Sequence, residues 1–170
     1  NLHHLEAGEP AIDSTVIDLK KWLPSLIQPF QERVQQRQQN FHLHLASDLP
    51  QIESNPKSLS RILTELLHNA CKYTPPGESI SLSVDFYPRL NTFQICVTNT
   101  GIEIPTEEHD RIFDKFYRIP KNDRWNQGGT GLGLALVKRI VESLGGSIQV
   151  KSATLQTCFI VQIPFEPRSL

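Results

Sequence analysis

The feature that most constrains this chain is a glycine-rich run at residues 128–134 (GGTGLGL), which leads directly into an apolar stretch at residues 135–144. Glycines at alternate positions leave backbone N–H groups unshielded where a helix begins, and the positive end of a helix dipole favours an anion there. The run therefore indicates a phosphate-binding loop that opens a helix.

Two common phosphate-binding loops do not fit this run. A dinucleotide-binding fold needs a buried strand that ends at the first glycine, but residues 117–127 (YRIPKNDRWNQ) are polar, contain Pro120 and show no alternation. A P-loop needs Lys followed by Ser or Thr after its last glycine, and Leu134 and Ala135 stand there instead. What remains is a polar lid that runs into a glycine-rich helix start.

Composition limits the kinds of partner. The chain has 170 residues, of which 38% are apolar, and this is enough for one packed domain. Its net charge of −1 provides no general field to attract nucleic acid or an anionic membrane surface, so we expect this piece to bind neither. No apolar run approaches the roughly 18 residues of a transmembrane helix. We therefore expect a cytoplasmic domain, although a longer parent protein can be anchored in a membrane.

The three cysteines are odd in number and far apart in the sequence. Cys71, Cys96 and Cys158 each stand in an apolar run. We therefore expect them to be reduced core thiols of a cytosolic protein, without a catalytic or metal-binding role.

Periodicity and turn residues predict a mixed order of helices and strands. Strands are predicted at residues 15–19, 41–45, 80–86, 93–98, 147–151 and 158–164, and helices at 20–39, 55–73, 105–116 and 135–144. Residues 88–91 are expected to close a hairpin between two of these strands. This order favours a two-layer α/β sandwich, in which a mixed, mainly antiparallel sheet carries the helices on one face.

The predicted helix at residues 55–73 has a strong start, because Asn55 can cap it and Pro56 suits its first position. One side of this helix is apolar, and the other carries a polar stripe of Glu65, His68, Asn69 and Lys72. A polar stripe is ordinarily a solvated face, so the stripe alone does not identify a site.

Four segments together resemble one family. They are residues 65–74 (ELLHNACKYT), 99–105 (NTGIEIP), 111–118 (RIFDKFYR) and 128–134. In this order they resemble the N box, first glycine box, F box and second glycine box of bacterial sensor histidine kinases. The chain thus resembles the catalytic ATP-binding domain of these kinases, whose Bergerat fold is shared with gyrase-type and mismatch-repair ATPases.

The resemblance covers about residues 12–165 and implies a domain boundary near the start of the chain. Residues 1–9 resemble the end of the helix of a dimerisation domain, and Gly8 followed by Pro10 is a typical helix stop. Residues 10–170 would then form the catalytic ATP-binding domain.

The resemblance implies that ATP lies between the N-box helix and the lid, with Mg²⁺ joining the phosphates to the helix. Asn69 would coordinate the metal through its amide oxygen, which suits a hard cation, and Lys72 would reach the phosphates. Tyr73 would lie against the adenine or simply close the core. Glu65 would act as a general base or help to hold the magnesium, or it is only a helix former on an exposed face.

The loops supply the rest of the implied site. Asn99 would accept a hydrogen bond from the adenine amino group, and Arg118 would contact the γ-phosphate and act in catalysis with Glu65 and Asn69. Phe113 and Phe116 are expected to anchor the lid in the core. The other residues implied to bind ATP are Gly101, Ile104, Gln127, Gly129, Thr130, Gly131, Leu132 and Gly133.

The sequence departs from the family pattern at two positions. Asn99 stands where the family usually has Asp, and the lost charge should weaken the bond to adenine by about 1 kcal/mol. Glu103 replaces a glycine, so the loop cannot depend on a positive φ there unless it is strained.

The implied reaction is transfer of the γ-phosphoryl group of ATP to a histidine on a dimerisation domain, for relay to the receiver domain of a response regulator. In such kinases the dimerisation domain normally belongs to the same polypeptide, which forms a homodimer. In the acceptor helix of such kinases, His is followed by Glu or Asp and, a few residues on, by Pro. This chain lacks that full pattern, so we expect no phosphorylation in cis. Two alternatives stay open: a nucleotide-binding regulatory module that has lost turnover, and a gyrase-type ATPase that uses Glu65.

Overall fold

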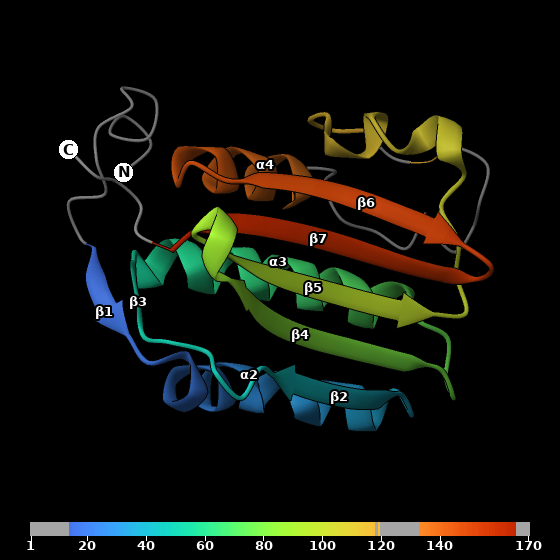
Figure 1. The fold of residues 1–170 in the computed structure, drawn as a ribbon. Coiled ribbons are helices and arrows are strands. Elements are labelled where there is room, and N and C mark those ends of the chain that lie inside the picture. The colour runs from blue at the N-terminus through green and yellow to red at the C-terminus, as the bar shows by residue number, and fades with distance from the viewer. Residues whose placement is uncertain (1–13, 118, 120–132, 166–170) are drawn as a thin grey trace.

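The computed structural model describes residues 14–117, 119 and 133–165, and its centre is a five-stranded sheet (Figure 1). The strands lie in the order β2-β4-β5-β7-β6. Only the pair β2 and β4 is parallel, while the other three pairs are antiparallel. The predicted mixed, mainly antiparallel sheet is thus confirmed. The strand bounds are β2 (Asn40–Leu45), β4 (Ser79–Tyr87), β5 (Thr92–Thr100), β6 (Ser147–Ala153) and β7 (Gln156–Pro164).

Three helices form the second layer, behind the sheet in Figure 1. They are α2 (Leu19–Gln36), α3 (Pro56–Tyr73) and α4 (Gly133–Ser143). The start of α3 is the predicted one, because the Asn55 side chain accepts a hydrogen bond from the Ser58 N–H at 3.0 Å and Pro56 opens the helix. The two-layer sandwich with helices on one face is confirmed.

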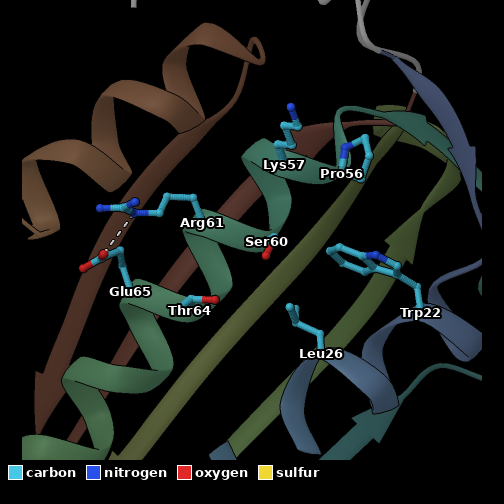
Figure 2. A pocket seen from close by; sticks show the side chains of 8 residues that line it. All are labelled: Trp22, Leu26, Pro56, Lys57, Ser60, Arg61, Thr64 and Glu65. Carbon is cyan, nitrogen blue, oxygen red and sulfur yellow. Dashed lines mark ion pairs between the residues drawn. The ribbon is translucent and has the colours of Figure 1, made fainter. Parts of the chain in front are cut away.

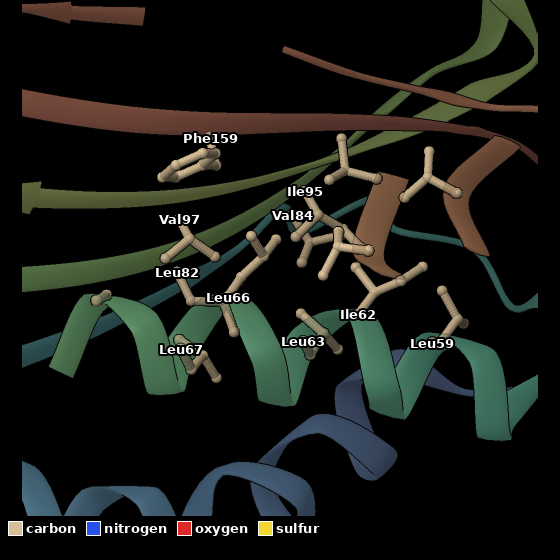
Figure 3. Close-up of a cluster of buried hydrophobic side chains, with 14 of the residues drawn as sticks. Leu59, Ile62, Leu63, Leu66, Leu67, Leu82, Val84, Ile95, Val97 and Phe159 are labelled. Carbon is tan, nitrogen blue, oxygen red and sulfur yellow. The ribbon is translucent and has the colours of Figure 1, made fainter. Parts of the chain in front are cut away.

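The core lies between α3 and the sheet (Figure 3). Strict alternation in β5 buries Phe93, Ile95 and Val97 on the side that faces the helices. Helix α3 contributes the facing apolar side, as its periodicity predicted. Its buried residues are Leu59, Ile62, Leu63, Leu66, Leu67, Ala70 and Cys71.

The opposite side of the sheet, which we call the open face, is not covered by any helix of the described part of the chain. The same alternation places Gln94, Cys96 and Thr98 of β5 on this face, next to Cys158 of β7. The prediction of core thiols is therefore correct for the buried Cys71 and wrong for Cys96 and Cys158, which are only half-buried. An apolar run in a sheet of this kind alternates between two faces, and the run alone does not say which face is covered.

One further segment differs from the predictions, and one agrees with them. A short strand, β3 (Ile52–Ser54), pairs with β1 (Thr15–Ile17) in a separate two-stranded sheet, and its three residues were too few to show a pattern. The hairpin between β4 and β5 is closed as predicted, by the 3-10 turn η1 (Pro88–Leu90) and by Asn91 with φ of +52°.

The predicted helix at residues 105–116 is wrong. The structure has two separate 3-10 turns instead, η2 (Thr106–Glu108) and η3 (Arg111–Phe113). Phe113 packs edge-on against Phe159 with ring centroids 6.2 Å apart, as an anchor should, but Phe116 is 69% exposed and has φ of +66°. The backbone of Asp114 is already extended, with φ of −77° and ψ of 144°, and the left-handed Phe116 also stops helical winding. The apolar spacing of this segment therefore did not produce one continuous apolar side.

Candidate functional site

The ends of α3, β5 and β7 meet around a small cavity of about 10 Å³, close to the space that one water molecule needs. The polar side chains in its wall come from three elements: Asn69 and Tyr73 from α3, Asn99 from β5 and Thr157 from β7. The apolar part of the wall consists of Leu66, Ala70, Val97 and Phe159. Three of the predicted site residues, two from α3 and one from β5, are therefore brought together here.

The amide of Asn99 is oriented by a buried threonine at the end of α3. Oγ1 of Thr74 donates its one proton to the carbonyl oxygen of Ala70 at 2.6 Å, so it can only accept from the Asn99 amide nitrogen, which lies 3.0 Å away. The nitrogen of Asn99 thus faces Thr74, and its carbonyl oxygen lies at the other end of the amide. Asn99 is only 5% exposed, so this orientation is held by packing as well as by the hydrogen bond.

A second threonine, Thr157, holds the loop that follows β5. Its hydroxyl donates to the carbonyl oxygen of Ile102 at 3.0 Å and lies 2.8 Å from the Ser152 hydroxyl, which in turn accepts from the N–H of Ile104 at 2.7 Å. Neither Thr74 nor Thr157 was assigned a role from the sequence. For Thr157, the available signal in the sequence was a small polar residue at an inward-facing position of an otherwise apolar alternation. For Thr74, it was a small polar residue next to the polar stripe of α3.

The loop of the first glycine box is tied to the turn between β6 and β7. Gly101 has φ of +85°, and its N–H donates to the carbonyl oxygen of Leu155 at 2.9 Å. Glu103 has no positive φ, as predicted, and its carboxylate accepts from the N–H of Leu155 at 2.9 Å. The residue that departs from the family pattern therefore stabilises the loop by a contact of its own.

Gly101 and Ile104 have clear structural roles in this loop. A Cβ on Gly101 would lie 2.6 Å from Cγ of Glu78 and 3.2 Å from Cδ of Pro75, so close packing and the positive φ both require glycine. The side chain of Ile104 belongs to the core and is 2% exposed. Their contacts to a nucleotide stay predictions.

Lys72 and Tyr73 lie side by side at the end of α3. The Lys72 ammonium is 5.6 Å from the centroid of the Tyr73 ring, within the range of a cation–π contact. Both side chains are half-buried. The positive charge therefore stands beside Tyr73, which lines the cavity together with Asn69 and Asn99.

Glu65 of α3 is paired with Arg61 (Figure 2) and also lies close to the start of α4. Its Oε2 forms an ion pair with Nε of Arg61 at 3.0 Å, and a Cβ added to Gly133 would lie 2.8 Å from its Oε1. A carboxylate is favoured at the first turn of a helix, where backbone N–H groups are unpaired. Gly133 is thus the predicted site residue whose lack of a side chain allows this close approach.

A wide groove of about 640 Å³ adjoins Glu65 on the side of α2. Figure 2 shows Trp22 and Leu26 of α2 facing the first turns of α3 across this groove. The remaining lining residues are Pro56, Lys57, Ser60, Arg61, Thr64 and Glu65.

Six of the predicted site residues lie outside the described residues. They are Arg118, Gln127, Gly129, Thr130, Gly131 and Leu132. Residues 1–9, predicted to end a dimerisation helix, also lie outside. Their roles stay predictions.

With the geometry in place, the comparisons with known proteins identify the family. Residues 54–167 match the model of the histidine kinase-, DNA gyrase B- and HSP90-like ATPases, and these residues are more than half of the chain. The chain belongs to this family. The match contains the N-box helix, the loop after β5 and the sheet that together surround the cavity, and it indicates an ATP-binding domain.

Relatives and solved structures within the family include histidine kinases. The chain is 36% identical over 167 residues to the circadian input-output histidine kinase CikA of Synechococcus elongatus, which is 96% of this chain and 22% of CikA. It therefore spans only about a fifth of that relative. The catalytic domain of the histidine kinase ThkA, at 25% identity, superposes with a TM-score of 0.79 over 92% of this chain and 100% of that domain.

One solved neighbour contains a signalling partner. ThkA in complex with the response regulator protein TrrA superposes with a TM-score of 0.75, covering 91% of this chain and 42% of ThkA, at 23% identity. This likeness concerns the fold.

No helix within the described residues is long and apolar enough to cross a bilayer.

Proposed function

We propose that this chain is the catalytic domain of a sensor histidine kinase, which binds ATP with Mg²⁺ and donates the γ-phosphoryl group to a histidine on a dimerisation domain. The observation that carries the proposal is the grouping of Asn69, Tyr73 and Asn99 around one cavity, with the Lys72 ammonium beside Tyr73. The family match and the histidine kinase relatives support it. The same proposal includes relay of the phosphoryl group to a response regulator. It also places the domain in the cytoplasm, where such a regulator works.

The adenine would be recognised by Asn99. The Thr74 hydroxyl fixes the amide so that its oxygen is the free end, and an oxygen there can accept from the exocyclic amino group of adenine. Guanine carries a carbonyl oxygen in that place, so two acceptors would face each other. Leaving a buried polar group unpaired costs about 1–3 kcal/mol, which would favour ATP over GTP.

The donor set around the phosphates suits magnesium. Within the described residues no group of three His, Cys, Asp or Glu could hold a metal, but magnesium usually takes one or two protein oxygens and fills the rest with phosphate oxygens and water. The amide oxygen of Asn69 would be such a ligand, and the Lys72 ammonium would pair with a phosphate. When bound, the ion would neutralise charge on the transferring phosphoryl group.

The remaining predicted residues would complete the site from the other side. Arg118 would contact the γ-phosphate as a catalytic residue, and Gln127 with residues 129–133 would close over the nucleotide. Glu65 is already paired with Arg61, which supports a role in orientation more than one as a base that activates water. A kinase must protect its γ-phosphate from water, so we expect only slow hydrolysis.

Nucleotide binding is the first test of this proposal. Isothermal titration calorimetry should show Mg²⁺-dependent binding of ATP that is tighter than binding of GTP, with ADP between them if Lys72 contacts the γ-phosphate. A matched pair, Asn69→Ala in the cavity wall and Asn91→Ala in the hairpin turn, separates the site from the general fold. Folded protein that binds no adenine nucleotide would overturn the proposal.

Phosphoryl transfer is the second test. A dimerisation domain that carries its acceptor histidine is supplied in trans with labelled ATP, and acid-labile, base-stable phosphate on that domain is the expected product. Binding without transfer to any such domain would favour the alternative of a regulatory module. Rapid phosphate release that Glu65→Gln abolishes and Glu142→Gln leaves unchanged would favour a gyrase-type ATPase.

A further inference from the structure

Two cysteines lie together on the open face of the sheet. Thr98 of β5 is directly opposite Cys158 of β7, and Cys96 is directly opposite Ile160. Cys96 and Cys158 are therefore diagonal neighbours on adjacent strands, with side chains on the same face. Both are free thiols, and both are partly accessible.

The thiols are in contact with each other and with polar neighbours. The side chains of Cys96 and Cys158 form a hydrogen bond. Nε2 of Gln94 donates to Sγ of Cys96 at 3.5 Å, and Thr98 hydrogen-bonds Cys158. On the far side of Cys158, directly opposite it on β6, stands Lys151.

These contacts favour a thiolate at one of the two positions. The hydrogen bond from Cys96, followed by the bond from Thr98 and the charge of Lys151, lowers the pKa of Cys158 to about 6 against the opposing effect of burial. The same hydrogen bond raises the pKa of Cys96, and burial, the negative sulfur beside it and Asp85 of β4 act in the same direction. At neutral pH Cys158 is thus the nucleophile, and Cys96 keeps its proton.

We propose that Cys96 and Cys158 form a redox-active dithiol that hydrogen peroxide oxidises reversibly to a disulfide between β5 and β7. The Cys158 thiolate attacks one oxygen of the peroxide, the O–O bond breaks, and the departing hydroxide takes a proton to become water, which leaves a sulfenic acid. Cys96 then attacks the Cys158 sulfur, the S–O bond breaks, and the second oxygen leaves as water with the Cys96 proton. Two thiols and one peroxide give one disulfide and two waters.

The position of the pair makes this oxidation local to two strands. Diagonal neighbours in an antiparallel sheet lie about 7–8 Å apart, just beyond the roughly 4.4–6.8 Å between the Cα atoms of a disulfide. The bond therefore requires the two strands to move closer together at this point. The residue after Cys96 is Val97 and the residue before Cys158 is Thr157, and both line the cavity on the opposite side of the sheet. The proposal itself concerns the thiols alone and does not depend on nucleotide binding.

Peptide mapping tests the proposal directly, because trypsin places the three cysteines in separate peptides, residues 62–72, 90–111 and 152–168. The intact protein is treated with hydrogen peroxide, blocked with N-ethylmaleimide under denaturing conditions and analysed by mass spectrometry. We expect the second and third peptides to be joined by a disulfide that dithiothreitol reverses. The buried Cys71 should be alkylated in full. Cys71→Ala should still form the bond, and Cys158→Ser should not.

The pH dependence of alkylation tests the role of each thiol without any disulfide. Modification of Cys158 by iodoacetamide should rise with a midpoint near pH 6. Cys96→Ala removes the hydrogen-bond donor and should move the midpoint up, whereas Cys96→Ser retains a donor and should move it less. The pH midpoint of alkylation is a better measure of the pKa than the alkylation rate, because thiolates of low pKa are also weaker nucleophiles.

Several results would overturn the proposal. One is folded protein in which Cys96 and Cys158 remain fully alkylatable after peroxide treatment. Another is direct oxidation of Cys158 to the sulfinic acid without a crosslink, and a third is a disulfide formed only between two molecules. An alkylation midpoint for Cys158 that Cys96→Ala leaves unchanged would contradict the thiol–thiol contact itself.

Discussion

The two faces of the five-stranded sheet are built by the same strands but carry different chemistry. Toward the helices, β5 presents Phe93, Ile95 and Val97, and then Asn99 at the point where α3 ends. Toward the open face, the residues between them are Gln94, Cys96 and Thr98. The candidate site therefore lies where the face toward the helices, the core face, changes from apolar to polar residues, and packing there fixes the side chains. The open face is free of that packing and can carry reactive groups.

The largest expected effect breaks the core face. Phe93 is 0% exposed, and Phe93→Ala removes a large side chain and leaves a cavity, which should lower the free energy of unfolding by about 3–5 kcal/mol. Gln94→Ala, the next residue along the same strand but on the open face, should change it by less than about 0.5 kcal/mol. Urea denaturation of both variants measures the difference. Equal losses would mean that both faces are covered.

The second-largest effect is expected at Asn99, where one substitution should change the stability of the protein and its affinity for ATP in opposite directions. Asn99→Asp places a carboxylate in a buried position that accepts well from adenine but is poorly paired without it. We expect the free energy of unfolding of the ligand-free protein to fall by about 1–3 kcal/mol, while ATP binding tightens by about 1 kcal/mol. Chemical denaturation and calorimetry give the two values.

The same change on the open face is the control for this prediction. Gln149→Glu in β6 also converts an amide to a carboxylate, but its side chain is exposed on the open face and is not in the cavity wall. It should leave both stability and ATP affinity nearly unchanged. If Asn99→Asp leaves ATP affinity unchanged, Asn99 does not face the base.

A smaller effect is expected at the turn that joins β6 and β7 and holds the loop of the site. Thr154 and Leu155 both have φ of +56°, and left-handed backbone costs a non-glycine residue about 1–2 kcal/mol. Leu155 is 61% exposed, so Leu155→Gly loses little burial and should stabilise the protein by up to about 1 kcal/mol. Leu155→Ala keeps the strain and is the matched control. Thermal unfolding that ranks glycine below alanine would exclude strain at this turn.

The smallest expected effect lies on the polar stripe of α3, outside both faces of the sheet. Burial and then Arg33, whose Nη1 lies 2.7 Å from Nδ1 of His68, lower the pKa of His68, and Lys72 acts in the same direction against Glu65. The unfolded chain therefore binds this proton more readily. The stability that neutral His68 contributes to the folded state is fully present above about pH 6.5. It is lost as the pH falls from there toward the pKa of His68 in the folded protein.

His68→Gln removes this titration. The variant should show a flatter fall of stability below about pH 6.5 than the parent protein, measured by urea denaturation at a series of pH values. His42→Gln, on the open face, is the control for loss of an imidazole. A variant at His68 with the same slope as the parent would show that the pKa of His68 does not differ between folded and unfolded protein.

Local features of the chain were predictable where a single element decided them. The start of α3 follows from Asn55 and Pro56, and the buried alternation of β5 follows from its sequence, because caps and period-two patterns act within a few residues. The family and its nucleotide segments were equally readable. The strand β3 was not predictable, because three residues are too few to show a period. The two 3-10 turns were not predictable either, because apolar spacing does not show where the backbone leaves the helical region, as it does at Asp114.

The sequence by itself determined the two-layer fold, the polar stripe of α3 and the set of segments that a nucleotide site needs. Tertiary structure alone decided which side chains touch: Thr74 with Asn99, Glu65 with the start of α4, and Cys96 with Cys158. The physical reason is that periodicity fixes the direction of a side chain within its own element. Contacts between elements depend on strand register and on how the helices lie on the sheet.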